Sequence, residues 1–301
     1  MSAIGFIGLG VMGEPMCRNL ARKSGLPVMG FDRDPQPLAR LQADGVTRAE
    51  SLEALTAACD HIFLALPGGK QVEEVCSKPD GLLTHARRGT LIVDLGTSPA
   101  DLTLRLASSF GEKGVRYADA PIARTRQAAI DGTLSIMVGA DEKTFAELRP
   151  LLAMMASDIT HCGPVGSGHV TKILNNMVLM ETVVALSEAV AIARRFGLDD
   201  ALLFDTLTKG SADSFALRNH GMKAILPGVF PERAFSTEYA RKDMSYALAL
   251  AEQLGVDARG AKTTDDLLRQ ASEAGFGQMY WPVLSRVIDK DAASDDAGVA
   301  A

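Results

Sequence analysis

The chain has 301 residues, of which 47% are hydrophobic and 23% charged, the size and balance of a globular protein with one large or two medium domains. Its 31 basic and 37 acidic residues give a formal net charge of -6, so the basic surface of a nucleic-acid-binding protein is not expected. The longest apolar stretches are short or carry Glu and Ser, and no basic segment precedes the first apolar run. We therefore expect a cytoplasmic protein without nucleic-acid or membrane partners.

The first half alternates two kinds of segment. Short β-branched or apolar runs alternate with amphipathic stretches from residue 3 to about residue 138, which is typical of βαβ units and a parallel sheet. The expected strands cover residues 3–7, 27–31, 61–66, 90–94, 116–118 and 134–138. The expected helices cover residues 13–23, 35–43, 51–58 and 99–113. This pattern predicts an α/β fold with a Rossmann-type doubly wound parallel sheet.

The second half reads as helical. After Cys162 the apolar residues follow helical spacing, beginning with one long helix over residues 170–196 that Gly197 ends. Further helices are expected over residues 201–209, 237–254, 261–274 and 280–288. We therefore predict a dinucleotide-binding domain at residues 1–165, an all-α substrate and dimerisation domain at residues 166–291, joined by the long helix, and a flexible tail at residues 292–301.

The first expected strand runs directly into a glycine-rich turn that opens the first expected helix, which is the context of a dinucleotide fingerprint. Gly8 allows the tight turn, Gly10 lets the backbone approach a pyrophosphate, and Gly13 permits close packing of helix on strand. The helix N-terminus adds N–H groups and a positive dipole end. The predicted cofactor-binding turn is Gly8-Leu9-Gly10-Val11-Met12-Gly13.

An acidic residue at the end of the second expected strand bears on the choice of cofactor. Asp32 stands 19 residues after Gly13, where its carboxylate can accept hydrogen bonds from the ribose hydroxyls of adenosine. This favours NAD, although Arg33 follows directly and offsets part of the repulsion toward a 2′-phosphate, so NADP stays open. The alternative for Asp32 is a cap of the turn before Pro35.

Nearly the whole chain resembles the β-hydroxyacid dehydrogenases, a family related to 3-hydroxyisobutyrate dehydrogenase, tartronate semialdehyde reductase and the N-terminal part of 6-phosphogluconate dehydrogenase. The resemblance rests on four blocks in the family's order. They are Gly-Phe-Ile-Gly-Leu-Gly-Val-Met-Gly-Glu-Pro-Met from Gly5, Asp-Ala-Pro from Asp119, Gly-Ser-Gly-His-Val-Thr-Lys-Ile-Leu-Asn-Asn from Gly166, and Lys242-Asp243.

The third block contains the predicted catalytic residues. Lys172 and Asn176 are four residues apart on the long expected helix and so share one face, with Asn175 beside them. The resemblance implies that Lys172 is the general acid/base of a reversible hydride transfer, because such a reaction needs a group that gives and retakes a proton at the carbonyl oxygen. Asn176 would hold the reacting hydroxyl or the lysine in line. The alternative is a surface lysine on an amphipathic helix.

The second block departs from the family. Where relatives have Val-Ser-Gly-Gly, this chain has Ile-Ala123-Arg124-Thr125, and in those relatives the serine and the following glycine contact the substrate carboxylate. Ala123 has no hydroxyl, whereas Arg124 carries a fork of donors that suits a carboxylate, phosphate or sulfonate. The Arg-Thr variant resembles sulfolactaldehyde reductases. The alternative is that Arg124 forms a salt bridge with a neighbouring helix.

Smaller matches complete the expected cofactor site. The resemblance places Leu66 and Pro67 against the ribose and Thr97 near the nicotinamide, with Gly96 replacing a family serine. Lys242 matches a family lysine that reaches the cofactor from the helical domain.

No metal site is expected, because the four cysteines lack C-x-x-C spacing and the five histidines lack an H-x-x-x-H pair. His169 lies inside the third block but is not expected to be a ligand or a catalyst.

The combined prediction is an NAD(H)-dependent oxidoreductase that interconverts a hydroxyl and an aldehyde on a short anionic substrate and works as a homodimer or homotetramer. Sulfolactaldehyde reductase is one specific reading, and 3-hydroxyisobutyrate dehydrogenase and tartronate semialdehyde reductase are alternatives. Imine reductases share the architecture but usually lack the lysine found at position 172. A non-catalytic dinucleotide-binding module is the alternative from a different class.

Overall fold

The computed structural model describes residues 3–232 and 234–289, which form two compact units. The first unit ends at Lys172 and the second begins at Ile173, so the division falls inside the longest helix, α9 (Ser167–Phe196). The domain boundary expected from the sequence, between residues 165 and 166, lies just before this helix. The tail expected over residues 292–301 lies outside the described residues.

A single sheet organises the first unit. Its strands follow the order β3-β2-β1-β4-β5-β6-β8-β7, with β9 paired to β8, and the neighbours from β3 to β6 are parallel. The order 3-2-1-4-5-6 is that of a doubly wound dinucleotide-binding sheet, whose ligand binds at the carboxyl ends of the strands where the order reverses, here β1 and β4. The predicted fold class is therefore confirmed. The strands are β1 (Ile4–Ile7), β2 (Val28–Phe31), β3 (Val46–Arg48), β4 (His61–Leu64), β5 (Leu91–Asp94), β6 (Arg116–Asp119), β7 (Ile122–Ala123), β8 (Leu134–Gly139) and β9 (Ala156–Gly163).

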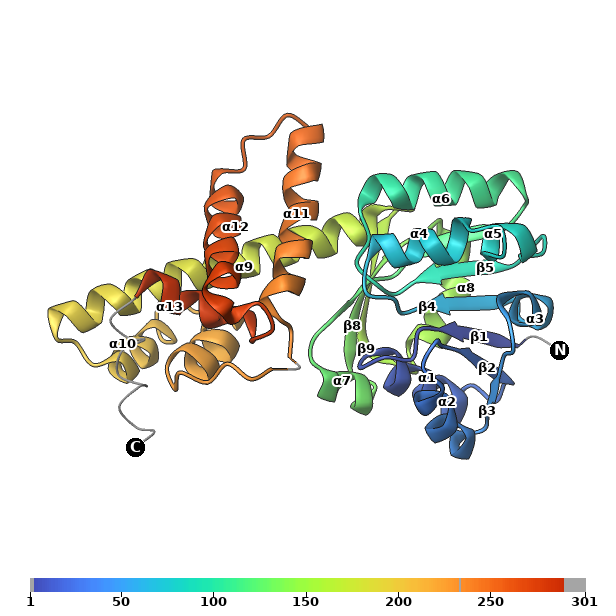
Figure 1. Ribbon diagram of the computed structural model, residues 1–301, viewed down its shortest axis with the longest axis horizontal. Coiled ribbons are helices and arrows are strands. Elements are labelled where there is room, and N and C mark those ends of the chain that lie inside the picture. The colour runs from blue at the N-terminus through green and yellow to red at the C-terminus, as the bar shows by residue number, and fades with distance from the viewer. Residues whose placement is uncertain (1–2, 233, 290–301) are drawn as a thin grey trace. The chain divides into compact units, whose positions relative to one another are not determined.

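Helices cover both faces of this sheet (Figure 1). Alternate strand residues face opposite cores: Phe6 and Phe63 pack with one set of helices, and Ile7 and Ile62 with the other. The first set is α1 (Gly13–Lys23), α2 (Pro35–Leu41), α7 (Arg126–Asp131) and α8 (Glu142–Leu152), with the short helix η1 (Gln42–Asp44) after α2. The second set is α3 (Leu52–Ala58), α4 (Gly69–Ser77), α5 (Leu82–His85) and α6 (Ala100–Glu112).

Several elements of the first unit were not predicted. The strands β3, β7 and β9 and the helices α4, α5, α7 and α8 are absent from the predicted set. The longest of these strands, β9, pairs with β8 alone and is largely exposed, so its residues are polar and lack the apolar run by which the buried strands were found. β3 and β7 are too short to show a period.

The second unit is helical, as predicted. Its core contains Phe204 and Trp281, both fully buried. The segment η2 (Leu217–Ile225) is a π-helix, and it was not predicted from the 3.6-residue period that is typical of an α-helix. The other helices are the remainder of α9, then α10 (Asp200–Leu207), α11 (Thr237–Gln253), α12 (Arg259–Ala271), η3 (Ser272–Phe276), η4 (Trp281–Leu284) and α13 (Ser285–Ile288).

α9 begins at Ser167, three residues before its predicted start, and ends where Gly197 takes a φ of 86°. It is long and apolar enough to cross a membrane by length and composition alone, with a mean hydropathy of 1.5. Half of its apolar window is buried within the protein, which is also what the core helix of a globular protein shows.

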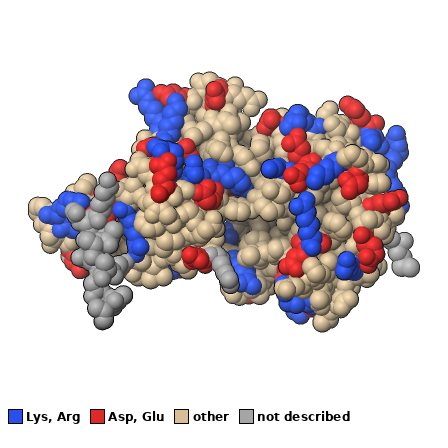
Figure 2. All heavy atoms as spheres, viewed as in Figure 1, with Lys and Arg blue, Asp and Glu red and all other residues tan. Residues whose placement is uncertain are grey.

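Charged side chains of both signs lie interspersed on the face drawn in Figure 2. In the described parts of the chain, charged side chains of opposite sign form ion pairs, such as that of Arg105 with Glu73 at 3.2 Å. This distribution agrees with the small negative net charge of the chain.

Candidate active site

The glycine-rich turn connects β1 to α1 in the manner predicted. Gly8 has a φ of 90°, and a Cβ there would lie 2.4 Å from the carbonyl oxygen of Ala65. A Cβ on Gly13 would lie 1.9 Å from the carbonyl oxygen of Gly8, so both positions require glycine. Gly10 differs, because a Cβ there would meet nothing within 4 Å. The open space over Gly10, at the start of the 11-residue helix α1, fits the pyrophosphate of a dinucleotide.

The carboxylate of Asp32 is tied to this turn. Its Oδ2 accepts a hydrogen bond from the amide of Leu9 at 2.5 Å, and its Oδ1 accepts one from Asp34 at 2.8 Å. Each oxygen retains a second lone pair, so the carboxylate can still accept hydrogen bonds from ribose hydroxyls. The bond from Asp34 caps the turn before Pro35, which is the alternative that the sequence left open for Asp32, and Asp34 itself caps the following helix α2 by accepting from Gln36.

Arg33 points its guanidinium toward an acidic partner. The side chain is exposed and its Nη2 lies 3.4 Å from a carboxylate oxygen of Glu74. Glu74 therefore places negative charge beside this arginine. A hollow of about 270 Å³ lies beside the turn and is lined by Leu9, Gly10, Val11, Glu14, Pro15, Arg18, Asp34, Pro37, Arg40, Arg126 and Ile130.

The loops after β4 and β5 carry the other predicted cofactor residues of the first unit, Leu66, Pro67 and Thr97. These loops are close to each other, since a Cβ on Gly69 would lie 2.5 Å from Pro99. Asp94, at the end of β5, accepts hydrogen bonds from the amide of Gly96 at 2.8 Å and from the hydroxyl of Ser98 at 2.7 Å. Thr97 lies between these two anchored residues and is half-buried.

Lys172 lies five residues after the start of α9 and is half-buried. The beginning of this helix is held by Asp119, whose carboxylate accepts hydrogen bonds from the amides of Gly166 at 2.6 Å and His169 at 2.7 Å. Burial raises the pKa of Asp119, whereas the electrostatic interaction with nearby His169 and these amide hydrogen bonds act in the opposite direction. A carboxylate at this end of a helix also interacts favourably with the helix dipole.

Asn176 is buried one turn after Lys172, and an acidic side chain of α11 orients it. Its Nδ2 donates to Oδ2 of Asp243 at 2.6 Å, and because an ionised carboxylate only accepts, this bond fixes which way the amide faces. Its Oδ1 accepts from Asn175 at 3.2 Å. The ammonium of Lys242 lies 3.0 Å from Oδ1 of Asp243 and 4.4 Å from the ring centre of Tyr239.

The segment that departs from the family pattern, residues 123–125, has an unusual backbone conformation. Arg124 has a φ of 87° and is, within residues 3–232 and 234–289, the one non-glycine residue with a positive φ. Its guanidinium donates to the carbonyl of Thr133 at 2.6 Å, to the hydroxyl of Ser157 at 2.8 Å and to the carboxylate of Asp158 at 2.7 Å. Its ion-pair partner is therefore in strand β9 and not in a neighbouring helix.

The two residues that flank Arg124 have simpler roles in the structure. Ala123 pairs with Ser135 in the β7–β8 ladder, and Thr125 caps α7 by accepting from the amide of Ala128.

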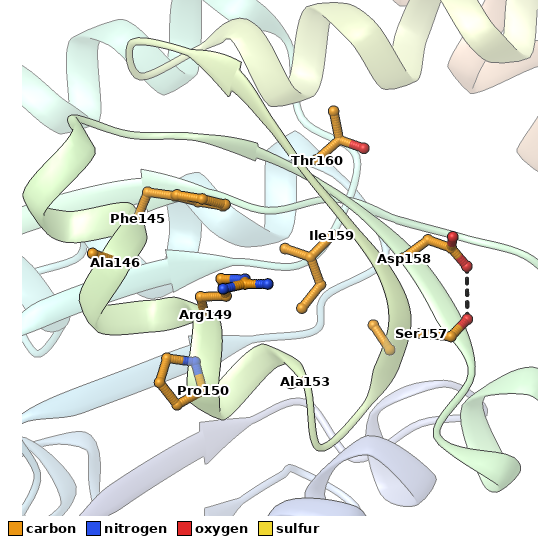
Figure 3. A pocket seen from close by; sticks show the side chains of 10 residues that line it. Phe145, Ala146, Arg149, Pro150, Ala153, Ser157, Asp158, Ile159 and Thr160 are labelled. Carbon is orange, nitrogen blue, oxygen red and sulfur yellow. Dashed lines mark hydrogen bonds between the residues drawn. The ribbon is translucent and has the colours of Figure 1, made fainter.

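A groove of about 770 Å³ lies between α8 and β9 (Figure 3). Of the predicted site residues, none lines it. Ser157 and Asp158, the two β9 partners of Arg124, do line it and are hydrogen-bonded to each other at 2.7 Å.

Sequence reasoning missed the residues that hold the predicted ones in place. Asp94 and Asp119 end neighbouring strands, and acidic residues at the carboxyl ends of buried strands were a usable signal. His169 was set aside, although it is fully buried beside both carboxylates. Asp158 gave no signal, because the strand that carries it was not predicted. Across the described parts of the chain, no three His, Cys, Asp or Glu side chains are grouped to hold a metal.

Two family models cover most of the chain. The NAD binding domain of 6-phosphogluconate dehydrogenase matches residues 3–163, and the model described as NAD-binding of NADP-dependent 3-hydroxyisobutyrate dehydrogenase matches residues 166–279.

Characterised relatives match over nearly full length. The chain is 37% identical to 2-(hydroxymethyl)glutarate dehydrogenase of Eubacterium barkeri, over 91% of each protein. It is 33% identical to 2-hydroxy-3-oxopropionate reductase of Escherichia coli, over 95% of this chain and 97% of that protein. The solved structure of Mycobacterium tuberculosis 3-hydroxyisobutyrate dehydrogenase with L-serine superposes with a TM-score of 0.87 at 30% identity, covering 96% of this chain and 99% of that one. The chain belongs to the β-hydroxyacid dehydrogenase family of NAD(P)-dependent oxidoreductases.

Proposed function

We propose that this enzyme reduces a short aldehyde bearing an acidic group with NADH, and oxidises the corresponding hydroxy acid in reverse, with Lys172 as the general acid/base. The observation that carries the proposal is the arrangement on α9. Lys172 and Asn176 lie four residues apart on one face, Asp119 holds the start of this helix, and the amide of Asn176 has a fixed orientation.

Bound NAD(H) supplies or accepts the hydride, and a side chain of the protein must donate or accept the proton. In reduction, Lys172 gives a proton to the carbonyl oxygen as negative charge develops there, and in oxidation it takes that proton back. Asn176 assists through its Oδ1, because the bond from Nδ2 to Asp243 fixes the orientation of the amide and so turns Oδ1 away from that carboxylate. An oxygen in this position accepts a hydrogen bond from the lysine ammonium or from the substrate hydroxyl, and so holds the proton donor in line.

The turn at Ala123, Arg124 and Thr125 is proposed to recognise the substrate's acidic group. The Arg124–Asp158 pair is exposed on both sides, so water screens it and separating the two charges costs little. An anionic substrate can therefore take the place of Asp158 on the guanidinium. Three sulfonate oxygens would use this fork of donors at least as well as a carboxylate, which supports sulfolactaldehyde as one substrate to test.

The cofactor preferred is proposed to be NAD. Asp32 keeps lone pairs for the ribose hydroxyls, and Glu74 already pairs with Arg33, the cation that would otherwise meet a 2′-phosphate. Lys242 remains a predicted cofactor contact from the second unit.

We also propose that the enzyme is cytoplasmic and forms a homodimer or homotetramer. Free buried cysteines at Cys17, Cys59 and Cys76 suit a reducing compartment. Exposed apolar side chains on α9, including Val178, Ile192 and Phe196, favour self-association, which sedimentation of the purified protein tests.

The function is tested by following NADH oxidation with sulfolactaldehyde, methylmalonate semialdehyde, tartronate semialdehyde and succinate semialdehyde. A kcat/KM at least tenfold higher for one of them, abolished in Arg124→Ala through a raised KM with the NADH Kd unchanged, supports the proposal. Absence of NADH oxidation with all four would contradict it, and an Arg124→Ala enzyme with unchanged KM would remove Arg124 from substrate recognition.

A further inference from the structure

Three ionisable side chains that the proposed mechanism does not use meet inside the first unit. Asp94 ends β5, Asp119 ends β6 and His169 lies in the first turn of α9, and all three are fully buried. A carboxylate removed from water is strongly destabilising unless hydrogen bonds or an opposite charge compensate it. The partners of this buried cluster therefore show which parts of the chain it holds together.

Asp119 fixes the first turn of α9 against the sheet. It accepts from the amides of Gly166 and His169, and there is no spare room around it. A Cβ on Gly139 would lie 2.4 Å from Oδ1 of Asp119, and a Cβ on Gly168 would lie 2.8 Å from its Oδ2. Movement of this turn would thus break two hydrogen bonds to a buried carboxylate.

Asp94 fixes the loop that follows β5. Its two oxygens accept from Gly96 and Ser98, and the hydroxyl of Tyr117 lies 3.5 Å from Oδ2. Thr97 lies between the two anchored residues. The two carboxylates thus hold two different segments, the loop with Thr97 and the helix with Lys172.

His169 connects these segments. Its Nδ1 lies 2.7 Å from the hydroxyl of Thr103, and that hydroxyl donates to the carbonyl of Pro99 at 3.0 Å. With the hydroxyl proton used in this way, Nδ1 carries the hydrogen and donates to Thr103. The other ring nitrogen, Nε2, is buried without a hydrogen bond in the structure and lies 3.6 Å from Oδ2 of Asp94, while Nδ1 lies 4.0 Å from Oδ2 of Asp119. The imidazole is placed between the two carboxylates.

We propose that His169 is a positioning residue that locks the first turn of α9 to α6 and to the loop after β5, and thereby sets the place of Lys172 relative to Thr97. This inference rests on the proposed function, because it assigns the acid/base role to Lys172. A misplacement of about 1 Å can lower a catalytic rate about 100-fold, so a side chain three residues from the acid/base can control kcat without touching the substrate.

Two polar substitutions distinguish the hydrogen bond of Nδ1 to Thr103 from the approach of Nε2 to Asp94. In His169→Asn the amide nitrogen takes the place of Nδ1 and keeps the bond to Thr103, whereas in His169→Gln the longer amide reaches the place of Nε2 and faces Asp94. His169→Leu removes both contacts, and Thr103→Val removes the Thr103 contact from the other side. The matched control is His161→Asn, since His161 lies in the same unit but bonds to the carbonyl of Ala140 at 2.7 Å.

We expect His169→Leu to lower kcat about 10- to 100-fold with the NADH Kd changed less than threefold, and His169→Asn to recover most of the loss. Hydrogen–deuterium exchange at the amides of residues 166–172 should become faster in His169→Leu and in Thr103→Val but not in His161→Asn. The exchange measurement is independent of turnover, so it decides the positioning role even if every aldehyde fails as a substrate.

Unchanged exchange at residues 166–172 in both His169→Leu and Thr103→Val would overturn the proposal. So would a wild-type kcat in His169→Leu, or an equal loss of kcat in His161→Asn. If His169→Leu does not fold, the other two variants test the proposal. Thr103→Val must then lower kcat, and His169→Asn must retain most of the wild-type kcat.

Discussion

The sharpest consequence of the glycine-rich turn is that Gly10→Ala should separate cofactor binding from stability. Gly10 has no positive φ, and a Cβ there would meet no atom within 4 Å in the protein alone. Replacing such a glycine by alanine stabilises a fold by about 0.4–1 kcal/mol, because the unfolded chain loses freedom. The same methyl group occupies the space that the pyrophosphate needs. Loss of one charge-assisted hydrogen bond costs about 1.5–3 kcal/mol, which raises the NADH Kd about 10- to 100-fold.

Two other glycines provide the comparison. In Gly13→Ala the new Cβ would lie 1.9 Å from the carbonyl oxygen of Gly8, so both stability and NADH binding should fall, stability by about 1–3 kcal/mol. In Gly111→Ala, on α6, nothing lies within 4 Å and neither property should worsen. The assays are thermal unfolding without cofactor and calorimetric titration with NADH. An unchanged NADH Kd in Gly10→Ala would refute the assignment of this turn to the pyrophosphate.

Three further predictions concern charges. Asp158→Asn releases Arg124 from an exposed ion pair, so the KM for an anionic aldehyde should fall about two- to fivefold, and a raised KM would show that Asp158 helps to bind substrate. Burial lowers the pKa of His220 from 6.5 to about 4, so the folded protein should lose up to about 3 kcal/mol as the pH falls from 6.5 to 4, and urea unfolding of His220→Asn should lack this loss. The hydrogen bond from Arg116 lowers the pKa of Glu147 from 4.5 to about 2, so its stabilisation is present above pH 4.5 and is lost toward pH 2; an equally steep acid transition in Glu147→Gln would contradict this.

The elements found from the sequence are those whose pattern is set by burial. β1, β4 and β5 are buried on both faces and read as continuous apolar runs, and α9 keeps helical spacing over 30 residues. β9 was missed because its exposed edge permits polar residues, and η2 because π-helical hydrogen bonding has no 3.6-residue signature. The sequence pattern therefore predicts elements whose residues are selected for burial in the core. It does not predict elements that are exposed to solvent or that have irregular backbone hydrogen bonding.

In the candidate site too, some residues were predictable from local sequence and others only from the folded structure. Gly8, Gly10 and Gly13 were predicted because their spacing stands between an expected strand and an expected helix, and Asn176 was paired with Lys172 because four residues make about one helical turn. The bonds of Asn176 to Asp243 and of Arg124 to Asp158 join residues 67 and 34 positions apart, and only the folded chain brings them together. Arg124 shows the limit most clearly, because its donors suggested an anion site while its partner Asp158 could not be inferred.

The central claim is that Lys172 transfers the proton, and the most direct test is the steady-state kcat of Lys172→Ala on the aldehyde that the wild-type enzyme reduces best. A positioned general acid contributes about 100- to 10,000-fold, so kcat should fall by that factor. The Kd for NADH should stay within about twofold, because the predicted pyrophosphate site lies at the turn before α1. A kcat within about threefold of the wild type would contradict the account.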